Sequence, residues 1–157
     1  MVASRVREAM GEAQPYIRYA GFWRRFPAAI IDGVIVGGAG SIVRYIILGV
    51  ALRSVGIGAV AAVADELLAI ATSWLYFTFM ESSSNQATVG KLALGIVVTD
   101  LEGRRISWGR ANGRYWSKFI SALIFLIGYI MAGFTAKKQA LHDMIAGTLV
   151  VIKETYR

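Results

Sequence analysis

The sequence predicts a mainly α-helical membrane protein with two transmembrane helices, a third apolar helical segment that is re-entrant or a single crossing, and a small cytoplasmic β-hairpin insert. Of its 157 residues, 56% are hydrophobic and 17% are charged, whereas soluble domains have about 25% charged residues. Two apolar stretches are long enough, at about 1.5 Å per residue, to cross a hydrocarbon core of about 30 Å. The cations lie beside these stretches, as is typical of cytoplasmic membrane flanks.

Composition also excludes several function classes. The net charge of +7 follows the membrane flanks, so we expect no nucleic-acid partner. The chain has no cysteine, which rules out disulfides, thiolate metal sites and a cysteine nucleophile. The single histidine, His142 beside Asp143, has no nucleophile and base around it in the sequence. We therefore expect no enzyme activity, no catalytic residues, no bound metal and no cofactor.

Residues 1–25 are predicted to form a cytoplasmic N-terminus, and residues 26–48 the first membrane span. The N-terminus shows no separate apolar core or cleavage site, so we expect no removable signal peptide. Within the span, Gly33, Gly37 and Ser41 recur every fourth position, which favours a helix-packing face for another helix. The alternative is that glycine is simply common in membrane helices.

Asp32 places a carboxylate inside the first span. An ionisable group at this depth costs several kcal/mol unless it is paired, so Asp32 is a candidate site residue. Arg25 precedes it by seven residues, two helical turns away on the same helix face.

Residues 60–80 form the second predicted span. Asp65 and Glu66 near its start are expected to be a solvated helix start. The aromatic residues near its end suit an interface belt; they are Trp74, Tyr76, Phe77 and Phe79. Because cations precede span one and follow span two, the positive-inside rule places the N-terminus in the cytoplasm and the short loop outside.

A polar insert is predicted over residues 81–118. Leu92–Thr99 and Arg104–Ser107 read as the two strands of a β-hairpin turning at Gly103. Since an isolated hairpin is marginal in water, Gly147–Ile152 is a candidate third strand.

The sequence leaves the topology of its last third open. Gly109–Lys118 is predicted to be a basic, aromatic helix at the lipid headgroups. Residues 119–136 then form the third apolar segment, followed by a C-terminal tail over residues 137–157. A single crossing would place the basic tail outside, whereas the charge bias favours a re-entrant pair of helices kinked around Gly128.

An ordered series of motifs now carries a family resemblance. They are Gly21-Phe-Trp-Arg-Arg25, Ile31-Asp32, Ala87-Thr-Val-Gly-Lys91, Leu94-Gly-Ile-Val-Val-Thr-Asp100, Gly103 and Leu141-His-Asp-Met-Ile-Ala-Gly-Thr-Leu-Val150. From about Tyr19 to Lys153 the chain resembles the RDD family of small bacterial and archaeal membrane proteins. By position, the family's arginine and two aspartates are Arg25, Asp32 and Asp143, and Arg114 stands where such proteins also tend to have arginine.

The resemblance implies a single three-segment domain over residues 1–157, in the cytoplasmic (inner) membrane of a prokaryote, crossing the bilayer more than once. Some family members have been proposed as Na⁺/H⁺ antiporters. A carboxylate that exchanges a proton for Na⁺ needs partial burial and oxygen neighbours. Asp32, Asp143 and Glu81, with Ser82, Ser83 or Thr88, are the candidates for these groups.

Two other roles remain open for the same charges. Arg25, Asp32 and Asp143 are equally suited to a buried ion-paired clamp that holds the third segment against span one. The chain would then be a non-catalytic accessory or assembly subunit. As an exchanger it is expected to be a homo-oligomer, whereas as a subunit it would belong to a larger membrane complex. The expected contacts are thus the lipid bilayer, another protein chain and, for an exchanger, Na⁺ and protons.

Overall fold

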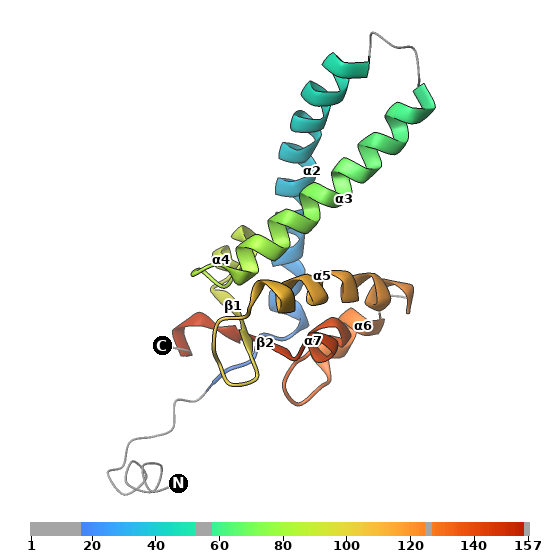
Figure 1. Cartoon of the computed structure of the whole chain (residues 1–157). Coiled ribbons are helices and arrows are strands. Elements are labelled where there is room, and N and C mark those ends of the chain that lie inside the picture. Colours follow the sequence, from blue (N-terminus) through green and yellow to red (C-terminus); the bar gives the residue numbers. More distant parts are fainter. Residues whose placement is uncertain (1–16, 53–57, 125–126, 156–157) are drawn as a thin grey trace, which may run out of the picture.

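Two long helices project together from a base built of short elements (Figure 1). The computed structural model describes residues 17–52, 58–124 and 127–155. In chain order the elements are α2 (Phe22–Leu52), α3 (Gly58–Ser82), α4 (Val89–Ala93), β1 (Ile96–Asp100), α5 (Trp108–Leu123), α6 (Ile127–Ile130), the 3₁₀ turn η1 (Met131–Gly133), α7 (Leu141–Ala146), β2 (Thr148–Ile152) and the 3₁₀ turn η2 (Lys153–Thr155).

Helices α2 and α3 are long and apolar enough to cross a membrane, over Phe22–Ile46 and Ala62–Ser82. Large apolar side chains on both helices are exposed, among them Val34, Ile42, Leu67 and Phe79. Such surfaces are stable when they face lipid rather than water. The predicted class, a mainly helical protein with two candidate spans, is therefore confirmed.

One ion pair joins the two long helices. Arg44 Nε on α2 donates to Asp65 Oδ1 on α3 at 2.8 Å. Nearby, a Cβ added to Gly40 would lie 3.8 Å from Thr72 of α3. Because α3 begins at Gly58, Asp65 and Glu66 lie two turns inside it, so the expected helix start is wrong. Asp65 is a partner of α2, while Glu66 is exposed as expected.

The predicted β-hairpin is wrong. Strand β1 pairs antiparallel with β2, in a register that places Ile96 opposite Ile152 and Asp100 opposite Thr148. Arg104–Ser107 forms no strand in the structure. The candidate third strand is therefore the direct partner of β1, and the sheet has two strands, with Tyr19 adding an isolated bridge to Val151.

The burial of β1 explains this choice of partner. All five of its residues are buried, and so are all five of β2. One face joins Ala20, Ala28 and Ile106 in the main core, and the other packs on Ala87. A strand buried on both faces needs an apolar neighbour. The predicted partner begins with two exposed arginines, Arg104 and Arg105, and cannot supply one.

The third apolar segment is not one continuous helix. Helix α5 runs through the predicted interfacial helix and on to Leu123, and α6 then folds back against it, with η1 packed against α6 and α2. Tyr129 Oη donates to the Lys118 carbonyl at 3.3 Å. A Cβ on Gly128 would lie 2.9 Å from Ser121 Cα, so only glycine permits this approach. The chain therefore turns back between Leu123 and Ile127 rather than running straight through.

Candidate functional site

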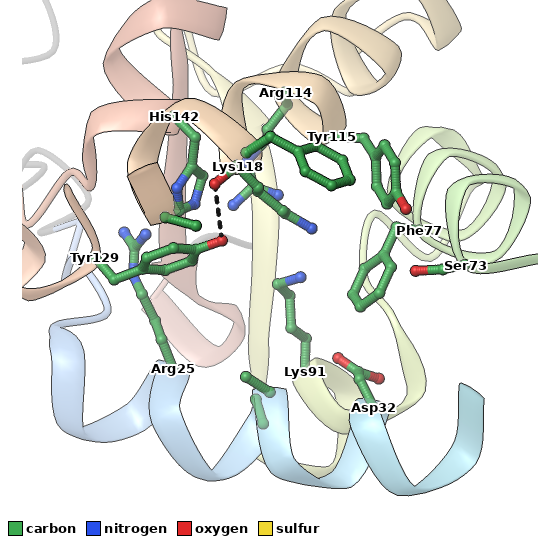
Figure 2. Close-up of a pocket in the computed structure, with 14 residues that line it drawn as sticks. Arg25, Asp32, Ser73, Phe77, Lys91, Arg114, Tyr115, Lys118, Tyr129 and His142 are labelled. Carbon is green, nitrogen blue, oxygen red and sulfur yellow. Dashed lines mark hydrogen bonds between the residues drawn. The ribbon is translucent and has the colours of Figure 1, made fainter. Parts of the chain in front are cut away.

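A cluster of buried and half-buried charges joins four helices at the base of the two spans, and Figure 2 shows two of its members, Arg25 and Arg114. Its members are Arg25 on α2, Glu81 on α3, Arg114 on α5 and Asp143 on α7. All four are residues that the sequence analysis singled out. Because they come from distant parts of the chain, the cluster fastens the short elements to the membrane helices.

Arg114 is the central member. Its Nε and Nη2 donate to Asp143 Oδ1 at 2.9 and 2.7 Å, and its Nη1 donates to Glu81 Oε2 at 2.6 Å. The residue is 2% exposed. Burial alone would lower the pKa of Arg114, but Glu81 and Asp143 together raise it above its ordinary value. The guanidinium therefore stays charged and bridges α3 to α7.

Arg25 holds the other oxygen of Asp143. Its Nη1 donates to Asp143 Oδ2, its Nε to the Ala20 carbonyl at 2.7 Å and its Nη2 to the Lys138 carbonyl at 2.6 Å. Asp143 Oδ2 also accepts from the amide of Ala140 at 3.1 Å. Burial alone would raise the pKa of Asp143, but Arg25 and Arg114 lower it well below its usual range. Asp143 is thus a permanent carboxylate.

Glu81 lies close to two further cations, Lys91 and Lys118. Lys91 Nζ on α4 donates to Glu81 Oε1 at 2.6 Å, and Lys118 Nζ on α5 lies 4.0 Å from the same oxygen. Lys118 Nζ also lies 3.8 Å from the centre of the Phe77 ring, a cation–π distance. Burial lowers the pKa of Lys118 to about 7.

Asp32 lies apart from the ion-paired cluster. It is 1% exposed and accepts from Tyr76 Oη at 2.8 Å, Thr88 Oγ1 at 2.6 Å and the Gly90 amide at 2.8 Å. A Cβ on Gly90 would lie 2.9 Å from Asp32 Cγ. Asp32 therefore binds the first turn of α4, and the expected clamp divides into an Arg25–Asp143 ion pair and this separate anchor.

His142 lies beside the ion-paired cluster but forms no short hydrogen bond with its charged members. Its Nδ1 lies 3.3 Å from Ser121 Oγ, and its Nε2 lies 3.5 Å from Asp143 Oδ1. Burial lowers the pKa of His142 to about 3. The imidazole is therefore neutral at physiological pH, with Tyr129 packed against it.

Other predicted residues lie away from the charges. The hydroxyls of Ser82 and Ser83 donate to carbonyls of their own helix, those of Thr78 and Met80. Gly33, Gly37 and Ser41 are exposed, and a Cβ on either glycine would meet nothing within 4 Å. This small-residue face of α2, defined by Gly33, Gly37 and Ser41, contacts no other described segment.

Sequence reasoning missed three site residues. Lys91 was visible only as the end of a motif, Lys118 only as one cation of an interfacial helix, and Tyr76 only as part of an aromatic group. Each acquires its role through a partner that is distant in sequence.

A cavity of about 350 Å³ lies among these groups. Figure 2 shows Lys91, Lys118 and Asp32 directed into it from three helices. Its inner wall is charged and buried, whereas Ala29, Phe119 and Ala122 at its rim are exposed. The remaining lining residues are Arg25, Ala28, Ser73, Phe77, Arg114, Tyr115, Tyr129 and His142.

The described part of the chain has no cluster of three His, Cys, Asp or Glu residues suited to a metal ion. Around the cavity, four cationic side chains face it directly, those of Arg25, Lys91, Arg114 and Lys118.

Two spanning helices fastened by a buried arginine–carboxylate network define a small integral membrane protein. The chain belongs to the RDD family, whose model matches residues 19–147. It is 40% identical over 152 residues to the uncharacterized protein YxaI of Bacillus subtilis (strain 168), covering 85% of this chain and 97% of that protein. It is 30% identical over 145 residues to the uncharacterized membrane protein YteJ of the same strain, covering 88% of this chain and 84% of that protein. No solved structure matches the chain.

Proposed function

We propose that this RDD protein is a non-catalytic accessory subunit that docks against a transmembrane helix of a larger membrane complex. The observation that carries the proposal is the state of its buried carboxylates. Asp32, Glu81 and Asp143 all accept charge-assisted or hydroxyl hydrogen bonds from within the chain. Carboxylates held in this way are suited to fixing a structure, because a transported cation would have to displace several donors.

The small-residue face supports docking. Gly33, Gly37 and Ser41 lie along one side of a spanning helix and stay exposed, whereas Gly40 faces α3. Small residues let the backbones of two membrane helices approach closely, and packing contacts drive association in lipid. In this proposal the N-terminus lies in the cytoplasm of a prokaryotic cell, the chain crosses the inner membrane more than once, and a partner helix covers this face.

The test is extraction from native membranes in a mild detergent, followed by native mass spectrometry. We expect the protein to travel with one defined larger complex in constant stoichiometry. Gly37→Leu should abolish this association, and Ile42→Leu, exposed on another side of α2, should preserve it. Recovery of the wild-type protein alone, or only as a homo-oligomer, would contradict the accessory role.

Cation–proton exchange is the second candidate, favoured by the position of Asp32. This carboxylate lines a cavity between the spans together with Lys118. Reconstituted vesicles with a pH-sensitive dye inside provide the assay. Na⁺-dependent proton flux that Asp32→Asn abolishes and Glu102→Gln preserves would support exchange. Wild-type vesicles with no flux above protein-free vesicles would exclude it.

A further inference from the structure

The cavity reaches from one end of the two spans toward their middle. On α2 its lining residues run from Arg25, near the start of the span, to Asp32, two helical turns further in, and on α3 they are Ser73, near the middle of the span, and Phe77, nearer its end. Helix α5 closes the third side and exposes Trp116 and Leu123. An amphipathic helix with exposed aromatic and apolar side chains is typical of the headgroup region. The cavity therefore opens where lipid headgroups lie.

Of the four cations that line the cavity, Lys118 donates the fewest hydrogen bonds within the described part of the chain. Arg25 and Arg114 each donate three hydrogen bonds within the chain, and Lys91 donates to Glu81 and Thr88. Lys118 Nζ, by contrast, reaches no acceptor within 3.5 Å among the described residues, its closest carboxylate oxygen being that of Glu81 at 4.0 Å. The ammonium group retains donors for a ligand.

The charge balance points to the same kind of ligand. Four cations line the cavity. Of the three nearby carboxylates, Asp32 also lines the cavity, and Glu81 and Asp143 form ion pairs with the cations. With Lys118 protonated, one positive charge is in excess in a buried setting. A buried excess charge is costly, and an acidic group in the cavity would offset it.

We propose that the cavity binds the acidic headgroup of an anionic amphiphile, with Lys118 as its ammonium partner and the hydrocarbon chains leaving over the rim formed by Ala29, Phe119 and Ala122. Ligand cavities commonly measure about 300–1,000 Å³. A volume of about 350 Å³ accommodates a headgroup but not a whole phospholipid. The exposed apolar rim gives the chains a path directly into the bilayer, and basic pockets between membrane helices are a recurring form of lipid site. This inference does not depend on the accessory role.

The experiment is native mass spectrometry of the purified full-length protein, titrated with dioleoyl phosphatidylglycerol or with dioleoyl phosphatidylcholine. We expect phosphatidylglycerol to bind at least about tenfold more tightly, as one charge-assisted contact provides. Lys118→Gln should remove this preference. Lys137→Gln, which removes the same charge from an exposed position, should keep it. Equal binding of the two lipids, or equal preference in the wild type and Lys118→Gln, would overturn the proposal.

A second variant tests the cavity without changing its charge. Ala122 is exposed at the rim, so Ala122→Trp should fold normally and obstruct the entrance, weakening phosphatidylglycerol binding by a similar factor. Unchanged binding in this variant would place the lipid elsewhere and refute the site. Oleate binding that requires Lys118 would extend the ligand class to carboxylates. Inorganic phosphate binding as tightly as phosphatidylglycerol would refute the role of the hydrocarbon chains.

Discussion

Replacing Asp143 by asparagine should destabilise the protein strongly. Asp143 is fully buried and accepts from Arg25, twice from Arg114 and from the Ala140 amide. Asparagine keeps the size but removes the charge, and its amide group places a donor against a guanidinium. Arg114 would keep only Glu81 as its anionic partner. Breaking a buried ion pair from one side costs about 3–5 kcal/mol, because the remaining charge is left uncompensated.

The assay is thermal unfolding in detergent, followed by tryptophan fluorescence. For a chain of this size each kcal/mol shifts the melting temperature by about 2–4 °C, so a fall on the order of 10 °C is expected. Glu102→Gln serves as the control, because Glu102 is exposed and pairs only with the exposed Arg104 among the described residues. An Asp143→Asn melting temperature equal to that of the control would refute the view that this network holds the fold together.

Further predictions concern pH, packing and topology. Below its ordinary pKa of about 6.5, His142 takes up a proton in the unfolded chain but stays neutral in the folded one. Stability should therefore fall by up to about 1.4 kcal/mol per pH unit between pH 6.5 and 5, and His142→Asn should flatten that slope in a melting-temperature series. Gly90→Ala should cost about 1–3 kcal/mol in denaturant unfolding, because its Cβ meets α2, whereas Gly113→Ala, with open space around it, should not destabilise. Single cysteines at Ser84 and Lys137, both exposed, should react with an impermeant thiol reagent from the same side of the membrane, and labelling from opposite sides would contradict the folded-back segment.

Local sequence patterns predicted the spans but not the sheet. Hydropathy over about 20 residues is a local property, and it located α2 and α3 directly. The partner of β1 is not local, since β2 begins about fifty residues later in the chain. Arg104–Ser107 is closer to β1 in the sequence and was therefore predicted as its partner. It is excluded because β1 is buried on both faces and requires an apolar neighbour. A kink around Gly128 was one of two alternatives left open by the sequence, because the close approach of Gly128 to Ser121 depends on tertiary packing.

The candidate site was predictable where one residue's chemistry sufficed. A carboxylate in an apolar span is a site candidate from sequence alone, which identified Asp32. Among its partners, Thr88 was a candidate from the sequence, whereas Tyr76 and the Gly90 amide were not. A backbone amide more than fifty residues away is a group that no charge pattern reveals. Lys118 was hidden among several cations, and only the cavity distinguishes it from them.

The bridge that Arg114 makes between Glu81 and Asp143 also imposes an order on biogenesis. A chain that is still being inserted already carries Arg25, Glu81 and Arg114 when the segment with Asp143 has not yet emerged. Until that segment docks, Arg25 and Arg114 lack their shared anion, and an uncompensated charge of this kind is costly. The network is therefore complete only when the C-terminal segment that carries Asp143 has docked.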